Sequence, residues 1–372
     1  MKYLLFLILV SNNIFSTEFS ERQERGIIDY QELDENSGMV VGSNNPNIIW
    51  AVNDGASNEI FGFDKFGKKT LIIKFKKNIL DENTDIEDLA LIRLNNNPYL
   101  VLPDIGDNNS NKQKCYIYFV PEPKIGNQTG VLNIDIDNIL KLEFEYEDGP
   151  RDAECFLADP ISNNFYIVTK REKKARLYSI PINFNNGHLI AEYILEFPFG
   201  NNGELGFTGV TAGDISKEGN LILIKDYNNV WLYSRTGNED LKYTFSKPPI
   251  RIDSYNYSLS KEPQGESICW ENYNTGFFTA SEEKSIPNFD ASLYYFEEIQ
   301  TSVIIENEQF NIQDNILYSK SLITLNLYFY NYIGQLIKNE KLSPSNSIDL
   351  NKYINQAHYL ILDNINSIIK LR

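Results

Sequence analysis

The chain has 372 residues, a formal net charge of −17 and an aromatic content of 13%. So acidic a protein repels nucleic acid and anionic membranes, and neither is expected as a partner. Abundant Tyr and Phe suit half-buried sheet faces, which favours an all-β fold. The acidic excess lies within residues 26–300, because the flanking segments are neutral. It favours cations or basic partners, or serves solubility alone.

The N-terminus predicts a secretory signal peptide over residues 1–16. Lys2 precedes an apolar run from Leu4 to Val10, and the polar segment after the run ends at the small residue Ser16. The run is too short to span a bilayer, and no later stretch approaches the length of a spanning helix. We therefore expect export to the periplasm, no transmembrane segment, and a mature protein that is secreted or held at the cell surface.

Residues 26–300 contain five similar units of three or four short strands, separated by turns rich in Asn, Gly and Asp. The first strands of the units begin at Ser37, Glu87, Glu154, Thr211 and Glu266. Outer strands are expected near residues 71–75, 140–146, 192–197 and 241–245. This organisation predicts a β-propeller of about five four-stranded blades, with six blades as the main alternative.

The fifth unit has no evident outer strand before residue 300, whereas the segment Ile27–Leu33 has no unit of its own. An N-terminal strand that completes the last blade closes the ring and removes an exposed sheet edge. We therefore expect residues 27–33 to pair with the fifth unit.

Three cysteines, Cys115, Cys155 and Cys269, are widely spaced and odd in number. They match neither a disulfide framework nor a CxxC metal site. Thiols packed in the core are the expected state, and one disulfide formed after export is the alternative.

Residues 305–372 have no acidic excess and a strand pattern typical of a small immunoglobulin-like β-sandwich. Strands are expected at 316–318, 325–330, 335–338, 347–350 and 358–362. The run Leu327–Ile337, with its Gly334–Gln335 turn, and the basic end Ile369–Arg372 resemble the type A sorting domain of the type IX secretion system. The chain departs from that family at His358, where glycine is usual. The resemblance implies that the type IX secretion machinery of a Bacteroidetes-type bacterium exports the protein across the outer membrane, often with removal of the tail.

The body of the chain also resembles a group of secreted bacterial propellers of unassigned function. The matching motifs are Asn53-Asp-Gly, Asp85-Ile-Glu-Asp-Leu-Ala, Asp104-Ile-Gly-Asp-Asn, Gly149-Pro-Arg-Asp-Ala-Glu, Val210-Thr-Ala-Gly-Asp and Gln264-Gly-Glu-Ser-Ile. Together they cover much of residues 35–300. The resemblance implies the fold and the acidic motifs but no particular reaction.

Three glutamates, Glu87, Glu154 and Glu266, occupy equivalent places in different units. In a propeller the inner strands begin near the central channel, so these carboxylates are expected in one funnel. Like charges held together raise one another's pKa, and a hard cation with oxygen ligands relieves that cost. The sequence thus favours a Ca²⁺ site formed by the three glutamates. The alternative is that they accept hydrogen bonds from backbone N–H groups, or from Arg and Lys, between blades.

The loops between the second and third strands open on the same face of a propeller. They carry polar groups that we expect to bind an extracellular ligand: Asn53, Asp54, Asp104, Asp107, Asn108, Lys170 and Arg171. The segment Asp104–Asn108 suits either a cation or an Asx turn. Lys170 and Arg171 suit a phosphate or carboxylate of the ligand, or form a solvated loop.

The sequence has two histidines, His188 and His358, and no HExxH, GxSxG or Walker pattern. Two functions therefore remain. The first is a secreted binding or scaffold module whose acidic face engages a cation, a glycan or a protein partner. The second is a metal-dependent hydrolase of phosphoesters or esters, in which Glu87, Glu154 or Glu266 acts as a base beside the cation.

Overall fold

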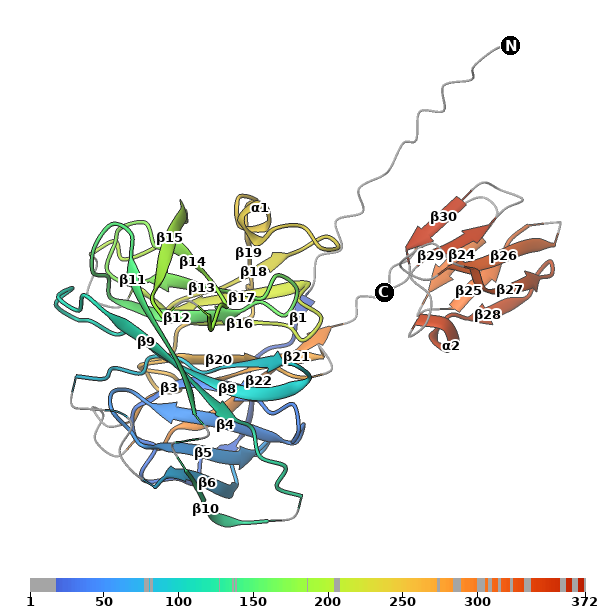
Figure 1. Ribbon diagram of the computed structural model, residues 1–372. Helices are drawn as coiled ribbons and strands as arrows, with labels where there is room; N and C mark the ends of the chain where they lie inside the picture. The colour runs from blue at the N-terminus through green and yellow to red at the C-terminus, as the bar shows by residue number, and fades with distance from the viewer. Residues whose placement is uncertain are drawn as a thin grey trace. The chain divides into compact units, whose positions relative to one another are not determined.

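The computed structural model describes residues 18–299 apart from 77–79, 81–82, 127, 136, 138, 186, 204–207, 273–274 and 284–288, and segments between residues 305 and 370. The expected signal peptide, residues 1–16, lies outside the described residues. The chain divides into two compact units, a body of residues 18–299 and a C-terminal unit after residue 299 (Figure 1).

The body consists of five groups of strands that follow one another along the chain (Figure 1). Group 1 contains β3 (Asn36–Val41), β4 (Ile48–Asn53), β5 (Glu59–Asp64) and β6 (Lys69–Phe75). Group 2 contains β7 (Ala90–Leu94), β8 (Asn97–Asp104), β9 (Cys115–Pro121) and β11 (Leu140–Tyr146). Group 3 contains β12 (Ala153–Ala158), β13 (Asn164–Thr169), β14 (Arg176–Pro181) and β15 (Leu189–Glu196). Group 4 contains β16 (Val210–Ile215), β17 (Leu221–Asp226), β18 (Val230–Ser234) and β19 (Ile250–Arg251). Group 5 contains β20 (Ser267–Trp270), β21 (Gly276–Ala280) and β22 (Ser292–Ile299).

The five groups form a closed ring. Their first strands contact one another in the cyclic order β3, β7, β12, β16, β20 and back to β3. Apolar clusters fill the space between each group and the next, and one of them joins group 5 to group 1 through Cys269, Phe278, Met39 and Phe61. Successive sheets packed around a common axis are the arrangement of a propeller, so the body is all-β and propeller-like.

Two parallel pairings tie neighbouring groups at their outer edges. Strands β11 and β15 pair over Phe144–Tyr146 and Leu189–Ala191, which joins groups 2 and 3 into one eight-stranded sheet. Strand β10 (Gly130–Ile134) pairs with the outer strand β6 of group 1. These pairings cover edge strands that would otherwise present free N–H and C=O groups.

The N-terminus closes group 5, but with a different segment from the one expected. Strands β1 (Glu18–Phe19) and β2 (Gln23–Ile27) both pair with β22. Of the expected segment, residues 27–33, only Ile27 belongs to this pairing; Ile28, Tyr30 and Leu33 are buried, and Tyr30 donates hydrogen bonds to the carbonyls of Gly62 and Leu71 at 2.9 and 3.1 Å. Ile28, Tyr30 and Leu33 pack in the apolar cluster between groups 1 and 5 and do not belong to a sheet face.

One expected outer strand is a helix. Residues 241–245 form the short helix α1 (Leu241–Phe245), and the outer strand of group 4 is β19. The side chain of Asp240 accepts a hydrogen bond from the backbone of Lys242 at 2.8 Å and caps the helix. Leu241 and Phe245, four residues apart, are both buried, so the apolar residues read as a strand follow a helical spacing.

All three cysteines are free and buried. Burial raises the pKa of the Cys115 thiol to about 12, and it also raises the pKa of Cys155 and Cys269. These thiols pack in the core, as their spacing predicted.

The C-terminal unit contains two four-stranded sheets that share one apolar core. One sheet contains β23 (Ile305–Glu306), β24 (Phe310–Gln313), β25 (Ile316–Ser319) and β28 (Ser347–Asp349). The other contains β26 (Leu325–Tyr330), β27 (Leu336–Leu342), β29 (Tyr359–Leu362) and β30 (Ser367–Lys370). The Gly334–Gln335 turn and His358 lie outside the described residues. Across the described parts of both units, no helix has the length and apolarity to cross a membrane.

Arg22 stabilises the N-terminal closure. Its guanidinium pairs with the buried Glu262 at 2.8 Å and donates to the carbonyl of Asn256 at 2.7 Å. We expect Arg22→Ala to lower the free energy of unfolding by about 3 kcal/mol, because Glu262 would keep a buried charge without this partner. Urea denaturation of the purified protein measures the change.

The matched control is Arg251→Ala. Arg251 pairs with Asp253, and their side chains are 55% and 84% exposed, so its loss should cost at most about 1 kcal/mol. Equal effects of the two substitutions would show that Arg22 has no special role in closure.

Candidate functional site

The candidate site lies where the inner strands begin. In β3, β12 and β16 the register shifts at Ser37, Glu154 and Thr211, so each is the extra residue of a β-bulge. A bulge bends the strand and changes the direction of its side chain. Glu87 and Glu266 lie shortly before β7 and β20. The five positions aligned from the sequence therefore share one end of the body.

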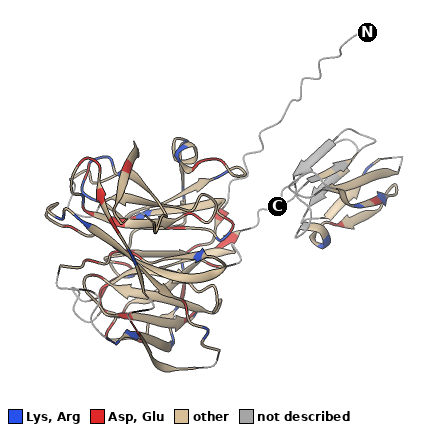
Figure 2. Ribbon diagram, in the orientation of Figure 1, with Lys and Arg blue, Asp and Glu red and all other residues tan. Residues whose placement is uncertain are grey.

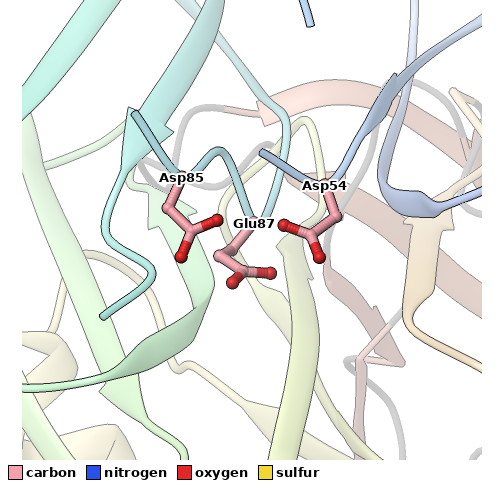
Figure 3. Close-up of side chains that lie close together, drawn as sticks. All are labelled: Asp54, Asp85 and Glu87. Atoms are coloured by element: carbon pink, nitrogen blue, oxygen red, sulfur yellow. The ribbon is translucent and has the colours of Figure 1, made fainter. Parts of the chain in front are cut away.

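Three carboxylates come together at this end: Asp54, Asp85 and Glu87 (Figure 3). Asp54 follows β4, whereas Asp85 and Glu87 precede β7. One oxygen of each residue lies within 4.8 Å of the others, with Glu87 buried and both aspartates partly exposed. Burial and the neighbouring Asp85 raise the pKa of Asp54 from 3.8 to about 7, and the two carboxyl groups are hydrogen-bonded. Without a cation, Asp54 therefore keeps its proton up to near neutral pH.

Gly106 shapes the space around Glu87 and Asp85. A Cβ atom built at Gly106 would lie 2.4 Å from Glu87 Oε1 and 2.6 Å from Asp85 Oδ2. Any side chain at position 106 would therefore press on both carboxylates. Burial, and next the charge of Glu154, raise the pKa of Glu87 well above its ordinary value. The three carboxylates are thus closely packed, and the buried one, Glu87, resists ionisation.

Lys170 neutralises a second part of the site. Its ammonium forms an ion pair with Glu154, lies 3.7 Å from Glu266 Oε1 and donates to the Tyr227 hydroxyl at 3.2 Å. Tyr227 in turn donates to Glu266. Burial acts against the charge of Lys170, but Glu154 and Glu266 raise its pKa well above its ordinary value. The lysine therefore remains charged and is occupied by the two glutamates.

Glu154 keeps one oxygen free. Its Oε2 is buried and has no hydrogen-bond partner within the described part of the chain. Burial raises the pKa of Glu154 well above its ordinary value, although the charge of Lys170 opposes the shift. Because Glu154 also raises the pKa of Glu87, the two carboxyl groups are close enough to interact. A buried carboxylate oxygen without a partner is costly, so Glu154 adds to the cost of holding these carboxyl groups together.

Glu282, which follows β21, adds a further carboxyl group. Burial and the neighbouring Glu266 raise the pKa of Glu282 to about 10, and the two side chains are hydrogen-bonded. Glu282 is therefore protonated at neutral pH and donates its hydrogen bond to Glu266. This proton, like the charge of Lys170, lowers the repulsion within the site.

Asp104 supports the triad through backbone and lysine contacts. Its Oδ1 accepts hydrogen bonds from the backbone N–H of Asp85 at 2.9 Å and from Lys112 Nζ at 2.6 Å. Lys112 also donates to the carbonyl of Gly106 at 2.7 Å. These bonds fix the two segments that carry Asp85 and Gly106.

Arg171 links Asn108 and Asp107 to group 3. Its guanidinium donates to the side chains of Asp152 and Asn108. Asp152 also accepts from the backbone N–H of Asp107 at 2.7 Å, and Asp107 accepts from that of Lys112 at 2.6 Å. The Arg171 side chain is 43% exposed, so part of the guanidinium faces solvent.

Asn53 makes local backbone contacts. Its side chain accepts from the backbone N–H of Glu35 at 3.1 Å and donates to the carbonyl of Glu32 at 2.6 Å. It thereby holds the segment before β3 against the end of β4. The structure therefore brings Asp54, Glu87, Glu154, Glu266 and Lys170 together, and it places Asn53 in a structural role.

Four groups that shape the site were not among the expected site residues: Asp85, Lys112, Tyr227 and Glu282. Asp85 lies two residues before Glu87, a spacing that puts both on one side of an extended chain. Tyr227 and Glu282 lie in loops equivalent to that of Asp54, so the repeat alignment contained their signal. Lys112 carries no such signal, because its contacts depend on how the loop between β8 and β9 folds back.

Net charge alone does not locate the site. Acidic and basic positions are interspersed along the body (Figure 2), and many acidic side chains are exposed. The site is distinguished by carboxyl groups that are buried and close together, since burial and repulsion together carry a cost that scattered surface charges avoid.

No protein-family model and no curated protein matches this chain. The PQQ-bound form of an aldose sugar dehydrogenase from Streptomyces coelicolor aligns with a TM-score of 0.40 and 9% identity, over 76% of this chain and 98% of that chain. A candidate 6-phosphogluconolactonase from Bacteroides uniformis aligns with a TM-score of 0.33 and 11% identity, over 84% and 88% of the two chains. Similarity this low assigns no function, and the propeller-like arrangement rests on strand order and core packing.

The raised pKa of Asp54 predicts a pH-dependent stability. Its folded value of about 7 lies above the ordinary 3.8, so wild type loses the stabilising effect of the proton as pH rises through this window. In cation-free buffer, Asp54→Asn should gain stability relative to wild type between these pH values and stay level above them. Chemical denaturation at several pH values measures the difference.

Asp148→Asn is the control with the opposite sign. Burial acts against it, yet hydrogen bonds from Arg151 and Tyr178 hold the pKa of Asp148 below its ordinary value. This variant should be less stable than wild type at neutral pH, and the gap should close in acid. A pH-independent difference for Asp54→Asn would show that Asp54 does not titrate at a raised pKa in the folded protein.

Proposed function

We propose that the protein is a five-bladed β-propeller whose acidic face binds one divalent cation, with Ca²⁺ preferred, and uses it to engage an extracellular ligand. The observation that carries the proposal is the close approach of Asp54, Asp85 and Glu87 oxygens, all within 4.8 Å (Figure 3). Calcium binds oxygen ligands at about 2.4 Å, so two ligands of one ion lie at most about 4.8 Å apart. The three carboxylates therefore suit one calcium ion.

The chemistry of the three carboxylates favours a cation over a permanent proton. A divalent ion would allow Asp54, Asp85 and Glu87 to ionise together, which burial and repulsion otherwise oppose. Gly106 leaves room for a cation, because the space that a Cβ atom would occupy there borders Glu87 and Asp85. The two nearby ammonium groups are already engaged, Lys170 by Glu154 and Lys112 by Asp104.

The exposed side of the triad gives the ion a route to a ligand. Asp54 and Asp85 are partly exposed whereas Glu87 is buried, so a bound cation would be open toward solvent on one side. Calcium accepts six to eight oxygen ligands, and three carboxylates leave positions for oxygens of a glycan or a protein. Arg171 is partly exposed, is held by Asp152 and donates to Asn108, two residues after Gly106; it would bind an anionic group of the same ligand.

Calorimetric titration with CaCl₂ tests the proposal. We expect one ion per chain, and affinity that rises with pH up to about 7 as the proton on Asp54 is released. Asp54→Asn, Glu87→Gln and Gly106→Ala should each weaken binding about tenfold or more. In chelator, the two carboxyl variants should be as stable as wild type or more stable, because repulsion is relieved.

Matched controls are Asp135→Asn, an exposed surface carboxylate, and Gly187→Ala, where a Cβ atom meets no neighbour within 4 Å. Neither should change calcium binding. Absence of binding in wild type, or equal weakening by the controls, would refute the cation site. Calcium-dependent cleavage of a chromogenic ester or phosphoester, lost in Glu154→Gln, would instead favour the hydrolase alternative at the same site.

We further propose that the mature protein acts outside the cell. The support is the signal-peptide pattern of residues 1–16 and the resemblance of residues 305–372 to a type IX sorting domain. The separation of the body from the C-terminal unit at residue 299 is consistent with a tail that can be removed without unfolding the body.

Truncation after residue 304 tests this assignment. In the native host the shortened protein should accumulate in the periplasm, without its signal peptide and with its melting temperature nearly unchanged. Cell fractionation and immunoblotting measure where it is. Normal appearance of the truncated protein in the medium or on the surface would exclude a sorting role for the tail.

A further inference from the structure

A cavity of about 190 Å³ lies where the five inner strands end. Each of the five groups contributes the late part of its first strand to the lining: Val41 of β3, Ile92 of β7, Ala158 of β12, Ile215 of β16 and Trp270 of β20. The acidic site lies where these same strands begin. The cavity is therefore a separate site, with room for several water molecules or one small solute.

The lining of the cavity is amphipathic, because half of its residues are apolar and half are polar or charged. The aliphatic walls include Val41, Ile92, Ala158 and Ile215. The uncharged polar part consists of Ser43, Asn163, Ser216 and Asn272. A ligand that fits this lining needs both C–H surface and hydrogen-bonding groups.

The charges of the lining balance. Two basic residues, Arg93 and Lys217, accompany two acidic ones, Asp214 and Glu271. Glu271 is already paired with Lys65 at 2.5 Å. A charged ligand would lose hydration in this cavity without meeting an excess of opposite charge, so the lining favours a neutral ligand.

Asp214 provides an acceptor inside the cavity. Its side chain is partly exposed, and one carboxylate oxygen accepts from the backbone N–H of Trp270 at 2.8 Å, which holds the group in place. Burial raises the pKa of Asp214 to about 7, although the bond from Trp270 opposes the shift. Because the carboxylate is incompletely solvated, O–H donors of a ligand would stabilise its charged form.

The mouth of the cavity provides both donors and acceptors. Asn163 and Lys217 are exposed, and Asn272 is partly exposed. Asn272 donates through Nδ2 to the carbonyl of Gly42 at 2.7 Å, which fixes its amide group. An amide can donate and accept, whereas an ammonium group only donates.

We propose that the cavity binds a neutral polyhydroxy compound of the size of one sugar ring. Its hydroxyl groups would donate to Asp214 and exchange hydrogen bonds with Asn163, Asn272 and Lys217. Its C–H groups would pack on the aliphatic walls. Each hydroxyl group both donates and accepts, so such a ligand satisfies a lining of mixed character without bringing a charge.

Other ligand classes fit the same lining less well. An apolar solute would cover Asp214 and the amide groups without giving them hydrogen bonds. A carboxylate would be repelled by Asp214, and an amine would bring a second cation close to Lys217. A protein segment or a polysaccharide exceeds the volume of the cavity.

Calorimetry of the full-length protein with D-glucose, D-galactose and D-mannose tests the inference at about pH 8, where Asp214 is mostly ionised. At least one of the three hexoses should bind with a Kd below about 1 mM. The uronic acid of the same configuration keeps the ring but adds a charge, and cyclohexanol keeps a ring but only one hydroxyl group. Both should bind at least about tenfold more weakly than the hexose.

Three variants locate the site. Asp214→Asn keeps the shape of the side chain but removes the charged acceptor, and it should reduce the affinity for the hexose at least about tenfold. Ala158→Leu fills the cavity and should abolish binding. Lys217→Ala changes an exposed residue at the mouth and should weaken binding about threefold.

The matched control is Asp253→Asn, whose side chain is 84% exposed, and it should leave the affinity unchanged. Circular dichroism and thermal melts establish that each variant is folded. If Ala158→Leu does not fold, Asp214→Asn and Lys217→Ala still decide the test.

Three outcomes would overturn the proposal. They are absence of heat with all three hexoses at millimolar concentration, binding of the uronic acid or cyclohexanol as tight as that of the hexose, and unchanged hexose affinity in folded Asp214→Asn. Chelator should leave hexose binding unchanged, because the cavity is distinct from the proposed cation site. Failure here is therefore distinguishable from failure of the cation site.

Discussion

The convergence of five inner strands on one axis is the constraint on which the rest of the structure depends. Each strand must pack closely against two others, so bulky side chains are excluded where the strands meet. A Cβ atom on Gly38 would lie 2.3 Å from the backbone nitrogen of Leu89, and one on Gly213 would lie 2.7 Å from Cys155 Sγ. Asp88 connects the strands at this depth by accepting from the backbone N–H groups of Leu89 and Phe156, both at 2.8 Å. A closed ring therefore needs small residues and satisfied backbone groups at its centre.

The same convergence forces functional groups together at the strand starts. Glu87, Glu154 and Glu266 are far apart in the sequence, yet their carboxyl groups share one poorly solvated region. Their positions could be predicted because the repeat aligns them at the first residues of equivalent strands. The bulges at Ser37, Glu154 and Thr211 could not be predicted, since they depend on one extra residue in the pairing with the second strand.

The limits of sequence inference have physical causes that particular residues show. Asp85 joins Asp54 because the segment before β7 folds against the loop after β4, a tertiary contact with no local signature. The apolar residues of 27–33 and 241–245 resemble strands, but the first set packs between groups and the second forms a capped helix. A pattern of apolar residues indicates that the segment is buried. Whether it forms a strand, a loop or a helix depends on the elements against which it packs. The inner strands of the repeat could therefore be predicted from the sequence. The outer segment 241–245 and the segment that closes the ring could not.

The carboxyl groups of the acidic site fall into two halves whose charges are neutralised in different ways. Lys170, Tyr227 and the protonated Glu282 satisfy Glu154 and Glu266 from within the chain, so that half has little need of an ion. In the other half, Asp54, Asp85 and Glu87, Asp54 loses its proton near neutral pH, whereas the buried Glu87 resists ionisation. A protein that needed merely to tolerate these carboxylates could have neutralised both halves in the same way. Among the described residues no lysine forms an ion pair with this half, and Gly106 borders it, so the proposed cation site rests on repulsion that the chain itself leaves uncompensated.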